Sequence, residues 1–233
     1  DSVVKASNDG IAYLFKKNKV AFFHGRGTLV KAGSDGCEVA VGGEKLPAKN
    51  VIVATGSVPR ALPGTPFDEK LVLSNDGALA LPEVPKRLGI VGAGVIGLEM
   101  GSVWRRLGSE VTLLEALPAF LGAADEQIAK EAAKIFAKQG LSIRLGVKIT
   151  AVKAKKDVSV EYSDAEGKAQ SATFDRLIVS IGRVANTEGL GAEAVGLKLD
   201  RGFIAVDDDC RTSVPGGWAV GDAVRGPMLA HKA

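Results

Sequence analysis

The stretch RLGIVGAGVIGLEMGSVWRRLGSEVTLLEA, residues 87–116, constrains the fold more than any other part of the chain. An apolar run at 88–91 enters three glycines in the spacing G-x-G-x-x-G (Gly92, Gly94 and Gly97). Residues 95–107 then carry apolar side chains at helical intervals, and a second apolar run, 111–114, ends at a lone acid, Glu115. This order predicts a strand, a tight turn, a helix and a second strand parallel to the first.

The three glycines have separate roles in such a turn. The first makes the tight turn off the strand, the second lets the backbone approach a diphosphate, and the third lets the helix pack closely on the strand. Phosphate groups would then meet the free N–H groups at the amino end of the helix. A Rossmann-like turn that binds no nucleotide is the alternative interpretation.

The acid at the end of the second strand indicates which nucleotide would bind. Glu115 lies 21 residues after Gly94, where a carboxylate accepts hydrogen bonds from an adenosine ribose. A 2′-phosphate would face this carboxylate, and residues 116–118 supply no arginine to balance it. We therefore expect NAD rather than NADP. A second carboxylate, Glu99, is either a solvent-facing helix residue or a group near the nicotinamide that pairs with a lysine, and its spacing does not decide between the two.

The rest of the chain predicts an α/β fold with two β-meanders. Residues 18–57 predict a meander that ends in a buried strand at 51–54, and a proline-rich crossover follows it. After the glycine turn, we expect a helix capped by Asp125 that ends at Lys138, with Gly140 as its stop. The last expected elements are a strand at 141–149, a second meander at 149–181 and a buried segment at 177–179 within it.

Composition excludes several classes of function. Lysine and arginine (30) nearly balance aspartate and glutamate (27), and no basic and aromatic stripe supports nucleic-acid binding. Cys37 and Cys210 are in no metal or redox spacing, which indicates two reduced thiols in a cytoplasmic protein. His24 and His231 form no metal-ligand pattern, and Glu99 interrupts the longest apolar run, so we expect neither a metal site nor a membrane span.

Four motifs in order resemble the dihydrolipoamide dehydrogenases, one family of the flavoprotein disulfide reductases. The resemblance covers the chain from about residue 18 to its end. The motifs are VIVATGSVPR at 51–60, the glycine-turn stretch at 90–118, LIVSIGRVANT at 177–187 and WAVGDAVRGPMLAHKA at 218–233. In the third motif Ala185 replaces the proline that is usual in G-R-x-P-N, a change that removes no chemical group.

The resemblance implies two sets of cofactor-binding residues. The NAD set comprises the glycine turn, the acid that holds the adenosine ribose, a residue packed on the adenine, a glycine beside the cofactor and the glutamate near the nicotinamide–flavin contact: Gly92, Ala93, Gly94, Val95, Ile96, Gly97, Glu99, Glu115, Ile149 and Gly182. The FAD set comprises a backbone contact to the adenine, the A-T-G segment, the ligand of the ribityl chain and the residues lining the flavin: Gly27, Ala54, Thr55, Gly56, Asp222, Met228, Leu229, Ala230 and His231.

The resemblance also implies a domain organisation. Residues 1–68 are expected to be part of an FAD-binding domain, 69–190 the NAD-binding domain and 191–233 a return to the FAD-binding domain. The family's first G-x-G-x-x-G, its C-x-x-x-x-C redox pair and its dimerisation domain with a histidine–glutamate pair are not in this sequence. We therefore expect an internal, monomeric fragment with no catalytic residue of its own and an incomplete FAD site.

The implied parent enzyme oxidises dihydrolipoamide through an enzyme disulfide and FAD, with hydride transfer to NAD. It would be a homodimer within a 2-oxoacid dehydrogenase complex. Two alternatives remain at this stage. The chain is an isolated NAD-binding module without activity, or its parent is another member of the group, such as an NADH oxidase or a relative of mercuric or glutathione reductase.

Overall fold

The computed structural model describes residues 2–229, which form two compact units. The central unit comprises residues 58–184. The flanking unit is built from the segments on either side of it, up to residue 57 and from residue 185 onward. The chain passes between the units in two short strands, β5 (Ser57–Pro59) and β14 (Arg183–Ala185).

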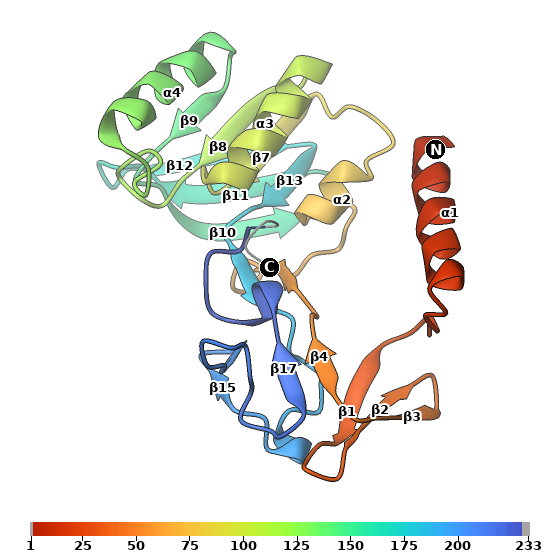
Figure 1. The fold of residues 1–233 in the computed structure, drawn as a ribbon. Coiled ribbons are helices and arrows are strands. Elements are labelled where there is room, and N and C mark those ends of the chain that lie inside the picture. Colours follow the sequence, from red (N-terminus) through yellow and green to blue (C-terminus); the bar gives the residue numbers. More distant parts are fainter. Residues whose placement is uncertain (1, 230–233) are drawn as a thin grey trace. The chain divides into compact units, whose positions relative to one another are not determined.

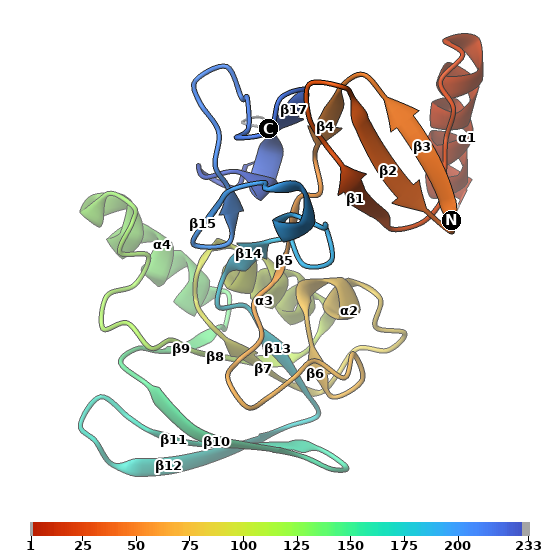
Figure 2. The same ribbon diagram turned by 90° about the horizontal axis from the view of Figure 1, so that it is seen from below.

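The central unit is built on a five-stranded parallel sheet with the order β6-β13-β7-β8-β9. These strands are β6 (Val72–Leu73), β7 (Arg87–Val91), β8 (Glu110–Leu114), β9 (Ser142–Arg144) and β13 (Arg176–Val179). Figures 1 and 2 show helices on one face of this sheet and an antiparallel meander on the other. The helices are α2 (Asn75–Leu79), α3 (Val95–Leu107) and α4 (Glu126–Lys138), and the meander is β10 (Lys148–Ala154), β11 (Val158–Ser163) and β12 (Ala169–Phe174).

Strand β7 shows why both faces of the sheet are covered. Leu88 and Ile90 are fully buried in the cluster on the helix side, whereas Val91 belongs to the cluster on the meander side. Gly89 also faces the meander, and a Cβ there would lie 2.5 Å from the Phe174 ring. A strand buried on both faces reads as a continuous apolar run, which is the pattern that the sequence carries.

The amino ends of the central strands are joined by a charged pair. Arg87 donates from Nη2 to Oδ1 of Asp175 at 2.7 Å. Burial raises the pKa of the Asp175 carboxyl, but its hydrogen bonds with Arg87 lower the pKa by more than burial raises it. The pKa of Asp175 therefore lies below its usual value. This pair therefore joins the amino ends of β7 and β13.

Several predicted elements are confirmed. Helix α3 has the predicted bounds, and the Asp125 side chain caps α4 by accepting from two backbone N–H groups of its first turn. Gly140 follows that helix with a φ of 89° and stops it. Neither Cys37 nor Cys210 forms a disulfide within the described residues. The α/β class with a parallel sheet and a meander is also confirmed, but the buried segment 177–179, predicted within the meander, belongs to β13 of the parallel sheet.

The prediction of one strand over 141–149 is wrong. Gly146, with a φ of 67°, breaks the segment into β9, which belongs to the parallel sheet, and β10, which begins the meander. Two backbone hydrogen bonds hold the break: Gly146 donates to Leu117 and Val147 donates to Glu115. The alternating pattern could not show this change of sheet, because both strands continue the same alternation.

The flanking unit combines a helix with several short strands. Its antiparallel sheet runs β1-β2-β3, and β4 pairs in parallel with β17. The elements of this unit, in chain order and with η marking short 3-10 helices, are α1 (Ser2–Lys17), β1 (Gly27–Lys31), β2 (Cys37–Val41), β3 (Glu44–Ala48), β4 (Val51–Val53), η1 (Glu193–Val195), β15 (Leu199–Asp200), β16 (Phe203–Ile204), β17 (Gly217–Ala219) and η2 (Gly221–Ala223).

Two predictions for this unit need correction. The predicted meander is present from residue 27, but residues 18–26 form no strand. The strand predicted as buried is β4, in which Val53 is buried and Ile52 is 67% exposed. Its alternation of covered and open positions is that of a strand with one covered face. Helix α1 had no counterpart among the predicted elements.

The structure adds two findings about other classes of site. Among residues 2–229, no helix is both long and apolar enough to span a membrane. Within the same range, no cluster of three or more histidine, cysteine, aspartate and glutamate side chains could hold a metal ion.

Candidate functional site

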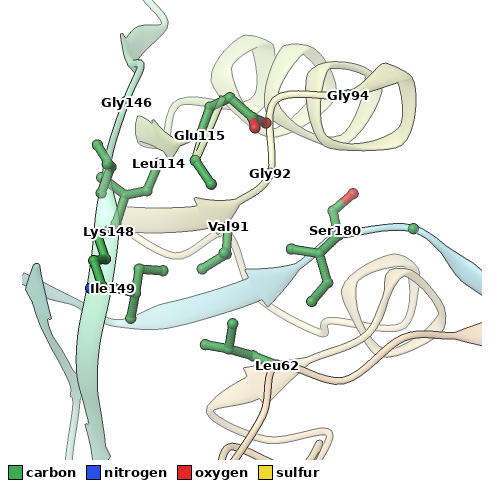
Figure 3. Close-up of a pocket in the computed structure, with 14 residues that line it drawn as sticks. Leu62, Val91, Gly92, Gly94, Leu114, Glu115, Gly146, Lys148, Ile149 and Ser180 are labelled. Atoms are coloured by element: carbon green, nitrogen blue, oxygen red, sulfur yellow. The ribbon is translucent and has the colours of Figure 1, made fainter. Parts of the chain in front are cut away.

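A cavity of about 660 Å³ lies in the central unit at the carboxyl ends of its parallel strands. Figure 3 shows how the ends of β7, β8 and β13 and the start of β10 surround it. The carboxyl edge of an open parallel sheet is where such folds bind ligands. The lining residues are Leu62, Val91, Gly92, Gly94, Leu114, Glu115, Ala116, Gly146, Val147, Lys148, Ile149, Ser180, Ile181 and Gly182.

The space around each glycine of the turn explains why glycine occupies that position. Gly92 has a φ of 99°, and a Cβ there would lie 2.3 Å from the carbonyl oxygen of Ser180. A Cβ at Gly97 would lie 2.1 Å from the carbonyl oxygen of Gly92, so this glycine sets how closely α3 approaches β7. A Cβ at Gly94 would meet no described atom within 4 Å. The first and third glycines therefore serve the packing, and the second leaves open space beside the cavity.

The amino end of α3 opens toward this space. Gly94 is its N-cap residue, and no side chain within the described part of the chain caps the helix. The first N–H groups of a helix have no partner inside the helix and carry the positive end of its dipole. Val95, Ile96 and Gly97 therefore present backbone donors of the kind that bind a phosphate.

Glu115 joins the end of β8 to the glycine turn. Its Oε2 accepts a hydrogen bond from the backbone N–H of Ala93 at 2.7 Å, and its Oε1 accepts one from Leu117 at 2.9 Å. An ionised carboxylate offers about four acceptor positions, so both oxygens can still accept further hydrogen bonds from a ligand. The acid thus fixes the turn from one side and faces the cavity from the other.

The structure brings half of the predicted NAD set together at one cavity. Gly92, Gly94, Glu115, Ile149 and Gly182 line one cavity, although they are spread over about 90 residues of sequence. Ala93 adjoins it through its bond to Glu115. The cavity is also lined by Leu62, Lys148 and Ser180, which were not among the predicted site residues. The sequence feature that could have indicated these lining residues is their position, since each lies within a few residues of a predicted strand end or turn.

Glu99 is not among the residues that line this cavity. It is exposed on α3 and lines a second cavity, of about 540 Å³, together with residues of α3 and α4 such as Val103 and Phe136. Val95 also lines this second cavity and is 66% exposed. Glu99 therefore lies outside the cavity lined by Gly92 and Gly94, and its role near a nicotinamide stays a prediction.

Part of the predicted FAD set is assembled within the flanking unit. Gly27 and Thr55 line a cavity of about 230 Å³ together with Asn186. Asn186 donates from its side-chain amide to the Thr55 carbonyl at 3.1 Å and from its backbone N–H to the Gly56 carbonyl at 2.9 Å. This asparagine, from the G-R-x-P-N motif, thereby fixes the A-T-G segment, of which Ala54 is an exposed member.

The second FAD motif is described only up to Leu229. The Asp222 carboxylate, in η2, accepts a hydrogen bond from the Ser57 hydroxyl at 2.6 Å. Met228 is partly buried and Leu229 is exposed. The remaining two predicted residues, Ala230 and His231, lie outside the described residues.

Comparison with known proteins identifies the family. The family model for pyridine nucleotide-disulphide oxidoreductases matches residues 2–233. The chain belongs to the pyridine nucleotide-disulphide oxidoreductase family. Within this family, it is 60% identical over 235 residues to a dihydrolipoyl dehydrogenase of Cupriavidus necator, with all of this chain and 50% of that protein covered. It is 43% identical to the mitochondrial dihydrolipoyl dehydrogenase of Homo sapiens, with 100% and 47% covered. The resemblance inferred from the motifs is confirmed.

Solved structures of the family show the same fold. LpdA from Mycobacterium tuberculosis superposes with a TM-score of 0.85 at 28% identity, covering 100% of this chain and 52% of that one. The HOCl-induced flavoprotein disulfide reductase RclA from Escherichia coli gives a TM-score of 0.80 at 26% identity, with 98% and 53% covered. The chain spans about half the length of the curated relatives it matches.

Proposed function

We propose that the central unit binds NAD in the cavity at the carboxyl ends of β7 and β8. The observation that carries this proposal is the meeting of the glycine turn with the Glu115 carboxylate at one cavity of about 660 Å³. This volume lies within the range of small-molecule sites, about 300–1,000 Å³. The open space beside Gly94 fits a diphosphate at the amino end of α3.

The residues around the cavity define how the dinucleotide would lie. The Glu115 carboxylate would accept hydrogen bonds from the adenosine ribose, and Ile149 would pack on the adenine. The backbone N–H groups of Val95, Ile96 and Gly97 would hold the diphosphate. The bound nicotinamide supplies the hydride chemistry, and the protein positions it. A 2′-phosphate would meet the same carboxylate, which favours NAD over NADP.

We propose that the whole protein is a dihydrolipoyl dehydrogenase that uses FAD and NAD. The 60% identity to such an enzyme over the full chain supports this assignment over a more distant reductase, since the solved RclA structures are only 26% identical. In the flanking unit, Asp222 would bind the ribityl chain of FAD and Thr55 would contact the flavin nucleotide. A homodimer within a 2-oxoacid dehydrogenase complex is part of this proposal, as is a cytoplasmic location.

We propose that this chain by itself binds NAD but does not catalyse the reaction. Cys37 is buried, and Cys210 is 173 residues away in sequence, so these thiols do not form the closely spaced redox pair of the family. The cavity beside Gly27 holds about 230 Å³, which is enough for part of FAD but not for all of it. The chain should therefore retain FAD poorly.

The proposal is tested by the effect of NAD on thermal unfolding. At about 100 times its Kd, NAD should raise the free energy of unfolding by about 2.7 kcal/mol. Gly94→Ala is the matched variant, because its Cβ would meet no atom of the described residues within 4 Å and should leave the melting temperature without ligand nearly unchanged. The same NAD concentration should stabilise this variant much less. A melting curve of the wild-type chain that does not move with saturating NAD would contradict the proposal.

A further inference from the structure

Ser180, at the carboxyl end of β13, carries a buried hydroxyl that the fold does not use. The residue lines the cavity, yet its Oγ is shielded from solvent and has no hydrogen-bond partner within the described part of the chain. Ser109, by contrast, is fully buried in the same unit and its hydroxyl donates to the Pro85 carbonyl at 2.6 Å. Buried polar groups in folded proteins almost always have a partner, so the exception at Ser180 requires an explanation.

The order of the sheet places Ser180 opposite Glu115 across the glycine turn. The strands run β8, β7, β13, with the acid at the end of the first, the turn after the second and the serine after the third. In Figure 3, the Ser180 oxygen points toward the glycine turn, where Gly92 and Gly94 lie. The contact is close, since a Cβ on Gly92 would lie 2.3 Å from the Ser180 carbonyl oxygen.

This order determines which part of the dinucleotide reaches the serine. With the adenosine ribose on Glu115 and the diphosphate at the turn, the nicotinamide half must continue toward β13. We infer that the Ser180 hydroxyl binds the ribose of that nicotinamide half. This contact requires that Oγ turn about the Cα–Cβ bond from its buried position into the cavity that the residue already lines. The inference rests on the proposed function, since it assumes that the cavity binds NAD.

The test compares three ligands that differ at the relevant end. ADP stops at the diphosphate, ADP-ribose adds the second ribose, and NAD adds the nicotinamide. Calorimetric titration of the whole chain should show that Ser180→Ala weakens the binding of NAD and ADP-ribose about three- to tenfold, which corresponds to one net hydrogen bond. ADP should bind this variant as tightly as the wild-type chain.

Thermal unfolding without ligand provides an independent readout. Ser180→Ala removes an unpaired buried hydroxyl, so the variant should melt at or above the wild-type temperature. Ser109→Ala is the matched control. It removes a paired buried hydroxyl away from the cavity, and should lower the melting temperature while leaving all three affinities unchanged.

The outcomes separate this inference from the proposed function. If the wild-type chain binds NAD and Ser180→Ala binds NAD and ADP-ribose equally well, the inference is wrong and the NAD site stands. An equal loss for ADP also contradicts it, because the serine would then act on the adenosine diphosphate half. If the wild-type chain binds none of the three ligands, both the inference and the proposed function fail.

Discussion

Replacement of Gly97 by alanine should destabilise the central unit by about 2 kcal/mol. The new Cβ would lie 2.1 Å from the carbonyl oxygen of Gly92, an atom of the turn backbone that cannot move aside as a side chain can. Overpacking of this kind costs up to about 3 kcal/mol, and the gain in helix propensity returns about 1 kcal/mol. In a thermal melt, the transition should fall by about 4–8 °C.

The control for this prediction lies one turn further along α3. A Cβ at Gly101 would meet only side-chain atoms, the nearest being Leu141 Cδ2 at 3.3 Å. Gly101→Ala should therefore change the free energy of unfolding by less than about 1 kcal/mol, because the crowding and the gain in propensity offset each other. Equal stability of the two variants would show that the close approach at Gly97 does not determine the packing of α3.

Replacement of Glu115 by alanine should weaken NAD binding about 100-fold, equivalent to about 2.7 kcal/mol. The variant loses the charge-assisted hydrogen bonds to the ribose and also the bond that holds the turn at Ala93. Because Ala93 is buried, its N–H would be left without a partner, and the chain without ligand should lose about 1–2 kcal/mol of stability. Titration calorimetry and thermal unfolding measure the two effects separately.

Two further variants make this prediction specific. Glu110, at the other end of β8, is exposed, so Glu110→Ala should leave NAD affinity and stability nearly unchanged. Glu115→Gln keeps the side-chain length with a single acceptor oxygen and no charge, and should bind NAD with intermediate affinity. If Glu115→Ala binds NAD as well as the wild-type chain does, the acid does not hold the ribose.

The elements around the glycine turn could be predicted from the sequence because local signals fix them. The apolar run before Gly92, the helix-forming residues up to Leu107 and the glycine after them each restrict the backbone on their own. The Asp125 cap and the Gly140 stop are equally local. In these segments, the tertiary structure supports what the local sequence already favours.

Other features depend on contacts that local patterns do not encode. The break at Gly146 follows from backbone hydrogen bonds to the segment after β8. Helix α1 was not predicted although apolar side chains such as Val4, Ile11 and Leu14 recur in it at helical intervals; in the structure these side chains are exposed and no residue of the helix is buried. The second role of Glu115, at the Ala93 N–H, and the unpaired hydroxyl of Ser180 emerge only when strand ends distant in sequence meet at one edge of the sheet.

A crystal structure of the chain with NAD tests the central claim most directly. We predict electron density for a dinucleotide in the cavity beyond β7 and β8. Its diphosphate should lie within hydrogen-bond distance of the N–H groups at 95–97, and its adenosine ribose should lie on the Glu115 carboxylate. A cavity that stays empty at saturating NAD, or a dinucleotide bound elsewhere on the chain, would contradict the account.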